Sequence, residues 1–115
     1  MNKIRYRKDI AAPSMWQVWW ACVKYDGTEG YKKRPVLVMG TDEKECTIAE
    51  MSSRPPSYKT DVPVMDLVHA GLMRESVIKT QTLRTIPKDS LRSRLGQLSY
   101  VDRDRVKKAI TARMC

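Results

Sequence analysis

Residues 33–40 constrain the fold of this chain more than any other stretch. Lys33 and Arg34 lead through Pro35 into the apolar run Val-Leu-Val-Met, and Gly40 ends it. A short apolar run between a proline and a glycine predicts a strand that is buried on both faces. Because proline has no N–H to donate to a ladder, we expect Pro35 to be the first residue of this strand. Arg34 would then lie on the loop end just before it.

Arg34 is the first candidate for a functional side chain. A guanidinium presents five donors in a fixed fork, which suits a phosphate or a carboxylate. On residue type alone, a surface arginine that caps a strand is the simpler explanation. The rest of the chain therefore has to decide between the two interpretations.

The charge balance points to an acidic partner. The chain has 115 residues, 22 of them Lys or Arg and 13 Asp or Glu, which gives a net charge of +9 and a pI near 9.7. Such an excess on a small domain favours binding to nucleic acid, to an acidic protein tail or to an anionic membrane surface. Solubility alone is the competing explanation.

The supply of metal ligands and thiols is small. The cysteines are Cys22, Cys46 and Cys115, and His69 is the single histidine. This odd and widely spaced set argues against a disulfide framework and against a structural zinc, so we expect no metal and no cofactor. The basic N-terminus is not followed by an apolar signal core, and no stretch is long enough to span a bilayer. We therefore expect a cytoplasmic protein without a membrane partner.

The chain is expected to form one domain over residues 15–115, preceded by an N-terminal extension, residues 1–14, that is disordered until it binds. Strands are predicted over 15–25, 36–39, 46–51, 61–67 and 76–86, a turn over 69–72, and a further strand or single helical turn over 91–98. Many short strands with regular turns predict a mainly β fold, a small closed or half-closed β-barrel.

A C-terminal helix is predicted to begin at Ser99. Ser99 and Asp102 have the spacing of a capping box, in which Asp replaces the usual Glu. Val106, Ala109 and Ile110 form an apolar stripe at helical spacing.

Three motifs, in this order and spacing, resemble the PemK/MazF/Kid family of toxin endoribonucleases from bacterial toxin–antitoxin pairs. The first is the loop Gly27-Thr28-Glu29 leading into Arg34-Pro35-Val36-Leu37-Val38, similar to the family's Gly-Ser-Glu-like loop and Arg-Pro-Val-Leu-Val. The second is the strand Ile48-Ala49-Glu50-Met51 ending in Ser52-Ser53, where the family has Thr, often Thr-Ser. The third is Ser76-Val77-Ile78 reaching Arg84-Thr85-Ile86.

The resemblance covers nearly the whole domain and implies a fold and an activity. It implies an SH3-like barrel that forms a homodimer, binds single-stranded RNA in a basic groove and is blocked by an antitoxin. Family members cut RNA without a metal. The RNA's own 2′-hydroxyl attacks the adjacent phosphorus, leaving a 2′,3′-cyclic phosphate and a 5′-hydroxyl.

The resemblance also assigns roles to residues. Arg34 would stabilise the charged phosphorane, the hydroxyl of Ser52 would bind a phosphate oxygen, and Glu29 is the nearest candidate for the general base. Ordinary strand-end turn chemistry remains the alternative for Ser52, and a solvated turn carboxylate for Glu29. The expected RNA-binding residues are Gly27, Thr28, Lys32, Lys33, Ser53, Lys79, Gln81 and Arg84.

The chain departs from the family pattern at two places. The Kid-like branch carries an Arg and an Asp as acid and base on the late strand, where this chain has Lys79 and Gln81, and glutamine cannot take a proton. Trp16 stands where the family often has Gly. Trp19 and Trp20 alternate along a strand, so we expect at least one of them in the core, with base stacking as the alternative role for a tryptophan.

Two other functions remain open on these residues. Lys79 and Gln81 favour a catalytically weak nucleic-acid-binding module on the same barrel. A gyrase poison is the third possibility, because a related toxin with this barrel binds that enzyme, and such a function would need neither Arg34 nor the Ser52 loop.

Overall fold

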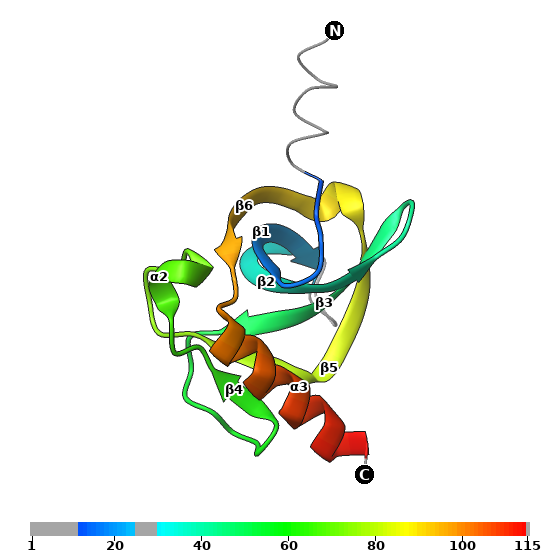
Figure 1. The fold of residues 1–115 in the computed structure, drawn as a ribbon. Coiled ribbons are helices and arrows are strands. Elements are labelled where there is room, and N and C mark those ends of the chain that lie inside the picture. Colours follow the sequence, from blue (N-terminus) through cyan, green and yellow to red (C-terminus); the bar gives the residue numbers. More distant parts are fainter. Residues whose placement is uncertain (1–11, 25–29, 115) are drawn as a thin grey trace, which may run out of the picture.

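The computed structural model describes residues 12–24 and 30–114 (Figure 1). Its strands are β1 (Gln17–Lys24), β2 (Tyr31–Thr41), β3 (Glu45–Ser52), β4 (Asp61–Pro63), β5 (Val77–Pro87) and β6 (Leu91–Gln97). Its helices are α2 (Leu67–Ala70), the single 3-10 turn η1 (Lys88–Ser90) and α3 (Tyr100–Met114). None of the helices in this described part is long and apolar enough to cross a membrane.

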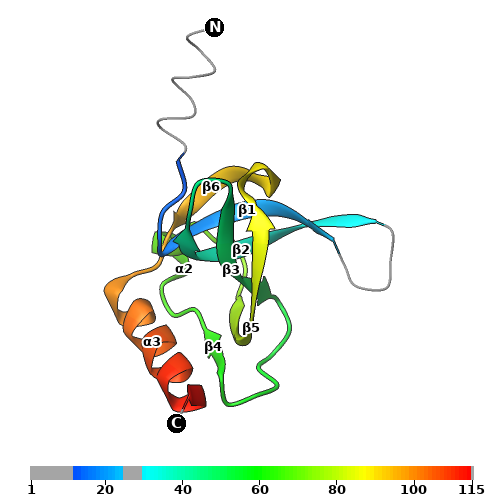
Figure 2. The same cartoon turned by 90° about the vertical axis from the view of Figure 1, so that its right-hand side faces the viewer.

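The strands form one antiparallel sheet in the order β4-β5-β3-β2-β1-β6. The mainly β class with one C-terminal helix is confirmed. The barrel is not closed, however, because β4 and β6 do not pair with each other among the described residues. The α3 helix lies against β4 and β5 (Figure 1), and the paired ends of β1 and β2 reach out beyond the rest of the sheet (Figure 2).

The central strand is buried on both faces, as its sequence predicts. Val36, Leu37 and Val38 have no exposed surface. Leu37 belongs to one apolar cluster, which includes the inner side of α3, while Val36 and Val38 belong to a second cluster on the other face. Each such side chain contributes about 1.5–3 kcal/mol when it leaves water, so the position of β2 in the sheet is strongly determined.

The prediction that Pro35 begins this strand was wrong. The β2 strand starts at Tyr31, and Arg34 lies inside it rather than on a loop end. Residues 31–35 pair with β1, whereas β3 pairs with β2 only from Val36 onward. Pro35 therefore stands where β2 is still an edge on its β3 side, and an edge tolerates a residue that lacks an N–H.

The segment after β4 also differs from its prediction, which extended a strand to residue 67 and made residues 69–72 a turn. The β4 strand ends at Pro63, and α2 follows, capped by the Asp66 side chain, which accepts a hydrogen bond from the His69 N–H at 3.0 Å. Gly71 ends the helix with φ 76, a left-handed conformation that glycine adopts without strain.

The C-terminal helix begins as predicted, but the second side chain of its capping box, Asp102, forms hydrogen bonds outside the helix. Ser99 Oγ accepts a hydrogen bond from the Asp102 N–H at 3.2 Å. The fully buried Asp102 carboxylate accepts from the N–H groups of Met65 and Asp66 at 3.0 Å. Asp102 thereby ties α3 to the segment that precedes α2. Residues 91–97 form a strand and not a helical turn.

Trp16 has an unusual backbone conformation for a residue with a side chain. Its φ of 77 is the single positive φ at a non-glycine residue in the described chain. Its N–H donates to the Val38 carbonyl at 2.7 Å and its carbonyl accepts from the Leu98 N–H at 2.9 Å, so the turn links β2 to the residue that follows β6. A left-handed conformation suits glycine best, so Trp16 carries backbone strain that a glycine at this position would not have.

Candidate active site

A pocket of about 550 Å³ lies at the end of β3. Several residues that the sequence singled out line it together: Lys32, Lys33, Arg34, Ser52 and Ser53. The pocket is concave and carries positive charge from three consecutive basic residues, which is the arrangement expected of a phosphate site.

The strand register explains why two motifs far apart in sequence meet in this pocket. Val36 pairs with Glu50 across β2 and β3. Continued two residues beyond this last pair, the same antiparallel register would set Arg34 opposite Ser52, and both residues line the pocket. Because side chains alternate between the two faces of a strand, Arg34 and Ser52 project from the same face.

Arg34 is held on a rigid part of the sheet. It lies opposite Ala21 in the β1–β2 ladder and is half-buried. Its neighbour Pro35 pairs with Trp20, and both of these residues also line the pocket. A guanidinium on such a support can place two parallel N–H groups on a phosphate.

Ser52 has a local hydrogen bond that matches the turn interpretation of this residue. Its Oγ accepts from the Arg54 N–H at 3.0 Å. A hydroxyl that accepts one hydrogen bond still has its own hydrogen to donate. The turn role and a phosphate-binding role are therefore compatible, and the turn hydrogen bond orients the hydroxyl.

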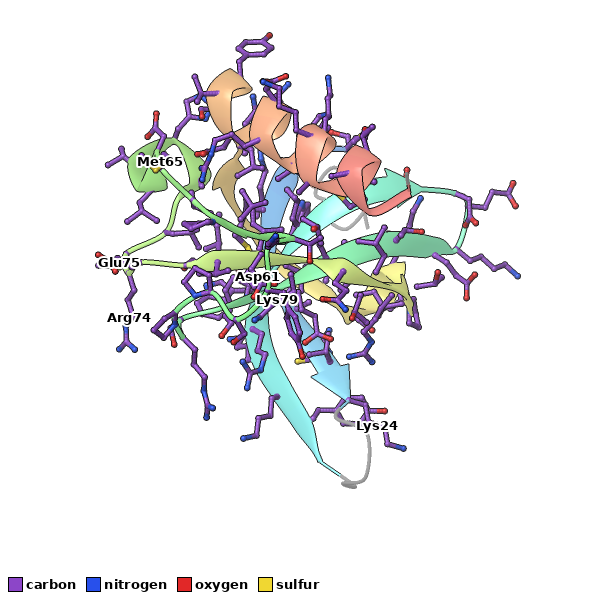
Figure 3. All side chains as sticks on the ribbon, turned by 90° about the horizontal axis from the view of Figure 1, so that it is seen from below. Lys24, Asp61, Met65, Arg74, Glu75 and Lys79 are labelled. Atoms are coloured by element: carbon purple, nitrogen blue, oxygen red, sulfur yellow. The ribbon has the colours of Figure 1, made fainter. Side chains whose placement is uncertain are left out.

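One wall of the pocket comes from residues that the sequence did not indicate as part of the site. Residues 71–76, which connect α2 to β5, supply Arg74 and Ser76, and Ser76 Oγ donates to the Arg74 carbonyl at 3.0 Å. A Cβ built on Gly71 would lie 2.0 Å from the Leu95 carbonyl oxygen, so glycine allows this segment to approach β6. Figure 3 shows the Arg74 side chain extending from the body at this place. No local pattern could have placed this wall, since it depends on packing against β6.

A second pocket, of about 300 Å³, contains two other predicted RNA-binding residues, Lys79 and Gln81. Its remaining lining residues are Glu50, Tyr58, Asp61 and Thr82. Glu50 and Ser52 are two residues apart on β3, so their side chains lie on the same face of the strand. Glu50 lines the second pocket and Ser52 lines the first, so the two pockets are neighbours along that face. Arg84 lines neither pocket.

Two carboxylates that line the second pocket form ion pairs with basic residues. Lys79 Nζ lies 2.9 Å from Asp61 Oδ2, and the two labelled side chains meet near the centre of Figure 3. Arg84 Nη1 lies 2.6 Å from Glu50 Oε2, and its Nη2 donates to the Lys24 carbonyl at 3.1 Å. The net positive charge here is therefore smaller than the sequence suggested.

The pKa of Asp61 reflects two opposing effects. Burial of the carboxyl group raises its pKa, but hydrogen bonds from Lys79 and from the N–H groups of Ser57 and Tyr58 outweigh burial and lower the pKa below its ordinary value of 3.8. Asp61 is accordingly charged at neutral pH.

The tryptophans divide between core and pocket. Trp19 and Trp16 are 3% and 9% exposed and belong to the two apolar clusters, whereas Trp20 is half-buried and lines the first pocket.

The predicted loop residues Gly27, Thr28 and Glu29 lie outside the described residues. Within residues 12–24 and 30–114, no three His, Cys, Asp or Glu side chains gather in a way that could hold a metal ion.

Comparison with protein families assigns the chain to a known family. The model of a family described as "PemK-like, MazF-like toxin of type II toxin-antitoxin system" matches residues 14–113, nearly the whole chain. Among curated proteins, none matches this chain in sequence.

Solved structures share the fold. The MazF-mt6 toxin of Mycobacterium tuberculosis is 25% identical, with a TM-score of 0.66 over 84% of this chain and 95% of its own. A mycobacterial endoribonuclease in complex with its cognate antitoxin is 16% identical, with a TM-score of 0.71 over 90% of this chain and 95% of its own. MazF in a MazE–MazF structure from Deinococcus radiodurans is 18% identical, with a TM-score of 0.69 over 89% of this chain and 95% of its own.

Proposed function

The chain belongs to the family of PemK-like, MazF-like toxins of type II toxin–antitoxin systems, and from this premise we propose that it is an endoribonuclease that cuts single-stranded RNA. Cutting would occur at short sequences and without a metal. The observation that carries the proposal is the meeting of Arg34 and Ser52 in one basic pocket.

The chemistry assigned to this pocket is an internal displacement at phosphorus. The 2′-oxygen of the RNA bonds to phosphorus, the bond to the 5′-oxygen of the next nucleotide breaks, and the products are a 2′,3′-cyclic phosphate and a 5′-hydroxyl. One proton leaves the 2′-hydroxyl and one reaches the departing oxygen. Arg34 neutralises the charge that grows on the phosphate oxygens, and the Ser52 hydroxyl donates a hydrogen bond to one of them. Glu29 is the proposed acceptor of the first proton.

Lys79 and Gln81 are proposed to bind RNA and not to transfer protons. Gln81 has no ionisable group, and Lys79 is engaged by Asp61. These two features support the second candidate, a module that binds RNA on the same surface and cuts it weakly or not at all. The two candidates differ in their products and not in their binding.

The proposed partners follow from the family and the charge. A cognate antitoxin would cover the first pocket and compete with RNA, and the net charge of +9 favours an acidic segment of such a partner. We further propose that the toxin works as a homodimer in the cytoplasm, where its RNA substrate is found.

The test is incubation of the purified chain with a long RNA in the presence of EDTA, followed by mapping of the ends. The expected result is a small set of cut sites whose ends are 2′,3′-cyclic phosphates and 5′-hydroxyls. Intact RNA at a protein concentration at which binding is measured would overturn the endoribonuclease and establish the binding module. Arg34→Ala, purified in parallel, controls for a contaminating ribonuclease.

A further inference from the structure

Asp61 carries an inference about which RNA sequence the protein selects, and this inference rests on the proposed function for its ligand class. The Asp61 side chain has no exposed surface. Its Oδ1 nevertheless has no hydrogen-bond partner among the described residues. A buried carboxylate oxygen is costly to leave unpaired, so the position is suited to a ligand that donates a hydrogen bond.

The rest of the carboxylate is fixed, which leaves Oδ1 for the pocket. Oδ2 accepts from the N–H groups of Ser57 at 2.8 Å and Tyr58 at 3.1 Å, and from Lys79 Nζ at 2.9 Å. Asp61 itself lines the second pocket. The side chain of Lys79 is 30% exposed, and its ammonium has further N–H groups to donate.

We propose that the second pocket binds a guanine base of the RNA and so determines the cleavage sequence. Two carboxylates, of Asp61 and Glu50, and one ammonium line the pocket. Guanine is the base whose Watson–Crick edge carries two neighbouring donor groups, N1–H and the N2 amine, beside one carbonyl oxygen. Asp61 Oδ1 accepts from N1–H, Glu50 accepts from the N2 amine, and Lys79 donates to O6.

Tyr58 supplies a surface on which the base can stack. Tyr58 is 61% exposed and lines the same pocket. Aromatic stacking holds a single-stranded base without regard to its identity, so it adds affinity while the polar groups add selectivity.

The pocket lies near the cleaved bond. Lys79 is on β5, two strands from Arg34 on β2 in the order β5-β3-β2. With neighbouring strands about 4.8 Å apart, the two side chains start on the order of 10 Å from each other. The bound guanine therefore belongs to a nucleotide close to the phosphate at Arg34.

Asp61→Asn is a specific test because the fixed contacts dictate how the amide sits. Three donors surround the Oδ2 position, so the amide oxygen must occupy it, and the amide nitrogen takes the place of Oδ1. An acceptor in the pocket becomes a donor, which fits the unprotonated N1 of adenine and opposes the N1–H of guanine. The matched control is Asp104→Asn, which makes the same change of charge on the exposed side of α3.

The experiment measures binding by fluorescence anisotropy, with 2′-O-methyl oligouridylates that carry one central G, A, C or inosine and cannot be cut. For the wild type we expect the G oligomer to bind about 10-fold or more tightly than the A and C oligomers, the order typical of one bidentate base contact. Inosine, which lacks the N2 amine, should fall between G and A. In Asp61→Asn the preference for G over A should be lost or reversed.

Tyr58→Ala is the second variant, because removal of an exposed ring leaves the fold unchanged. It should weaken the binding of every oligomer about 10-fold, while Tyr100→Ala, which removes another exposed tyrosine, on α3, should not. If Asp61→Asn does not fold, the wild-type preference and Tyr58→Ala decide the outcome.

Two results separate this inference from the proposed function. Cutting of long RNA at sites with no guanine at a fixed position, together with equal binding of the four oligomers, would overturn the guanine pocket and keep the endoribonuclease. Selective binding of the G oligomer without any cutting would support the guanine pocket and remove the endoribonuclease.

Discussion

Arg34→Ala is the sharpest test of the first pocket. The substitution removes the guanidinium and leaves Lys32, Lys33 and Ser52 in place, so RNA should still bind. Loss of one donor that acts in the transition state lowers the rate by about 10²–10³, or about 2.7–4 kcal/mol. We expect the cleavage rate to fall by at least this much, because both N–H groups of the fork are lost together.

The fold should survive this change. Arg34 lies in β2 opposite Ala21, outside both apolar clusters, and an arginine-to-alanine change on a strand costs at most about 1 kcal/mol of stability. Single-turnover cleavage of a labelled RNA, with thermal unfolding of the same samples, separates the two effects. Arg34→Lys keeps the charge but not the fork, so its rate should lie between those of the wild type and the alanine variant.

A matched control is Arg92→Ala, since Arg92 is exposed on β6 and lines neither pocket. Its cleavage rate should equal that of the wild type. An Arg34→Ala protein that cuts RNA as fast as Arg92→Ala would refute the assignment of Arg34.

Three further predictions concern the site and its support. Ser52→Thr should retain cleavage in the same assay and Ser52→Ala should lose most of it, because threonine keeps the hydroxyl; equal rates for the two would exclude a role for that group. The logarithm of the RNA association constant should fall with the logarithm of the salt concentration, with a slope of about −0.7 per phosphate contact. A cognate antitoxin should displace RNA, so a ternary complex of the protein, RNA and antitoxin would count against a shared site. The pKa of Asp61 in the folded state is lowered below 3.8, so the charged carboxylate stabilises the fold fully above pH 3.8, and this stabilisation is lost as the pH falls through the folded-state pKa. The thermal stability of Asp61→Asn should therefore depend less on acid pH than that of the wild type. Parallel pH dependences of the two proteins would contradict the ion pair with Lys79.

A fourth prediction also concerns stability. Trp16→Gly relieves a left-handed conformation worth roughly 1–2 kcal/mol but removes a buried indole worth about 3–5 kcal/mol. Urea denaturation should therefore show a net loss of stability.

The sequence by itself determined the parts of this protein whose signals are local. The apolar run at residues 36–38 predicted a buried strand because its hydrophobicity leaves no solvent-facing side. Ser99 predicted the start of α3 because a capping side chain accepts a hydrogen bond from a backbone N–H within one turn of its own position. Arg34 and Ser52 could be singled out through the family motifs, and two strands in antiparallel register were enough to bring them together.

Tertiary structure decided what depends on contacts between distant segments. Asp61 and Lys79 meet because β4 pairs with β5, and a three-residue strand has too little pattern to reveal its register. The wall at residues 71–76 is placed by the approach of Gly71 to β6, and the segment before α2 is held by Asp102, 37 residues away from Met65. Hydrogen bonds of this kind join a side chain to a distant part of the backbone, so they leave no periodic pattern in the sequence. The second pocket, with the unpaired Oδ1 of Asp61, could therefore be found only in the folded chain.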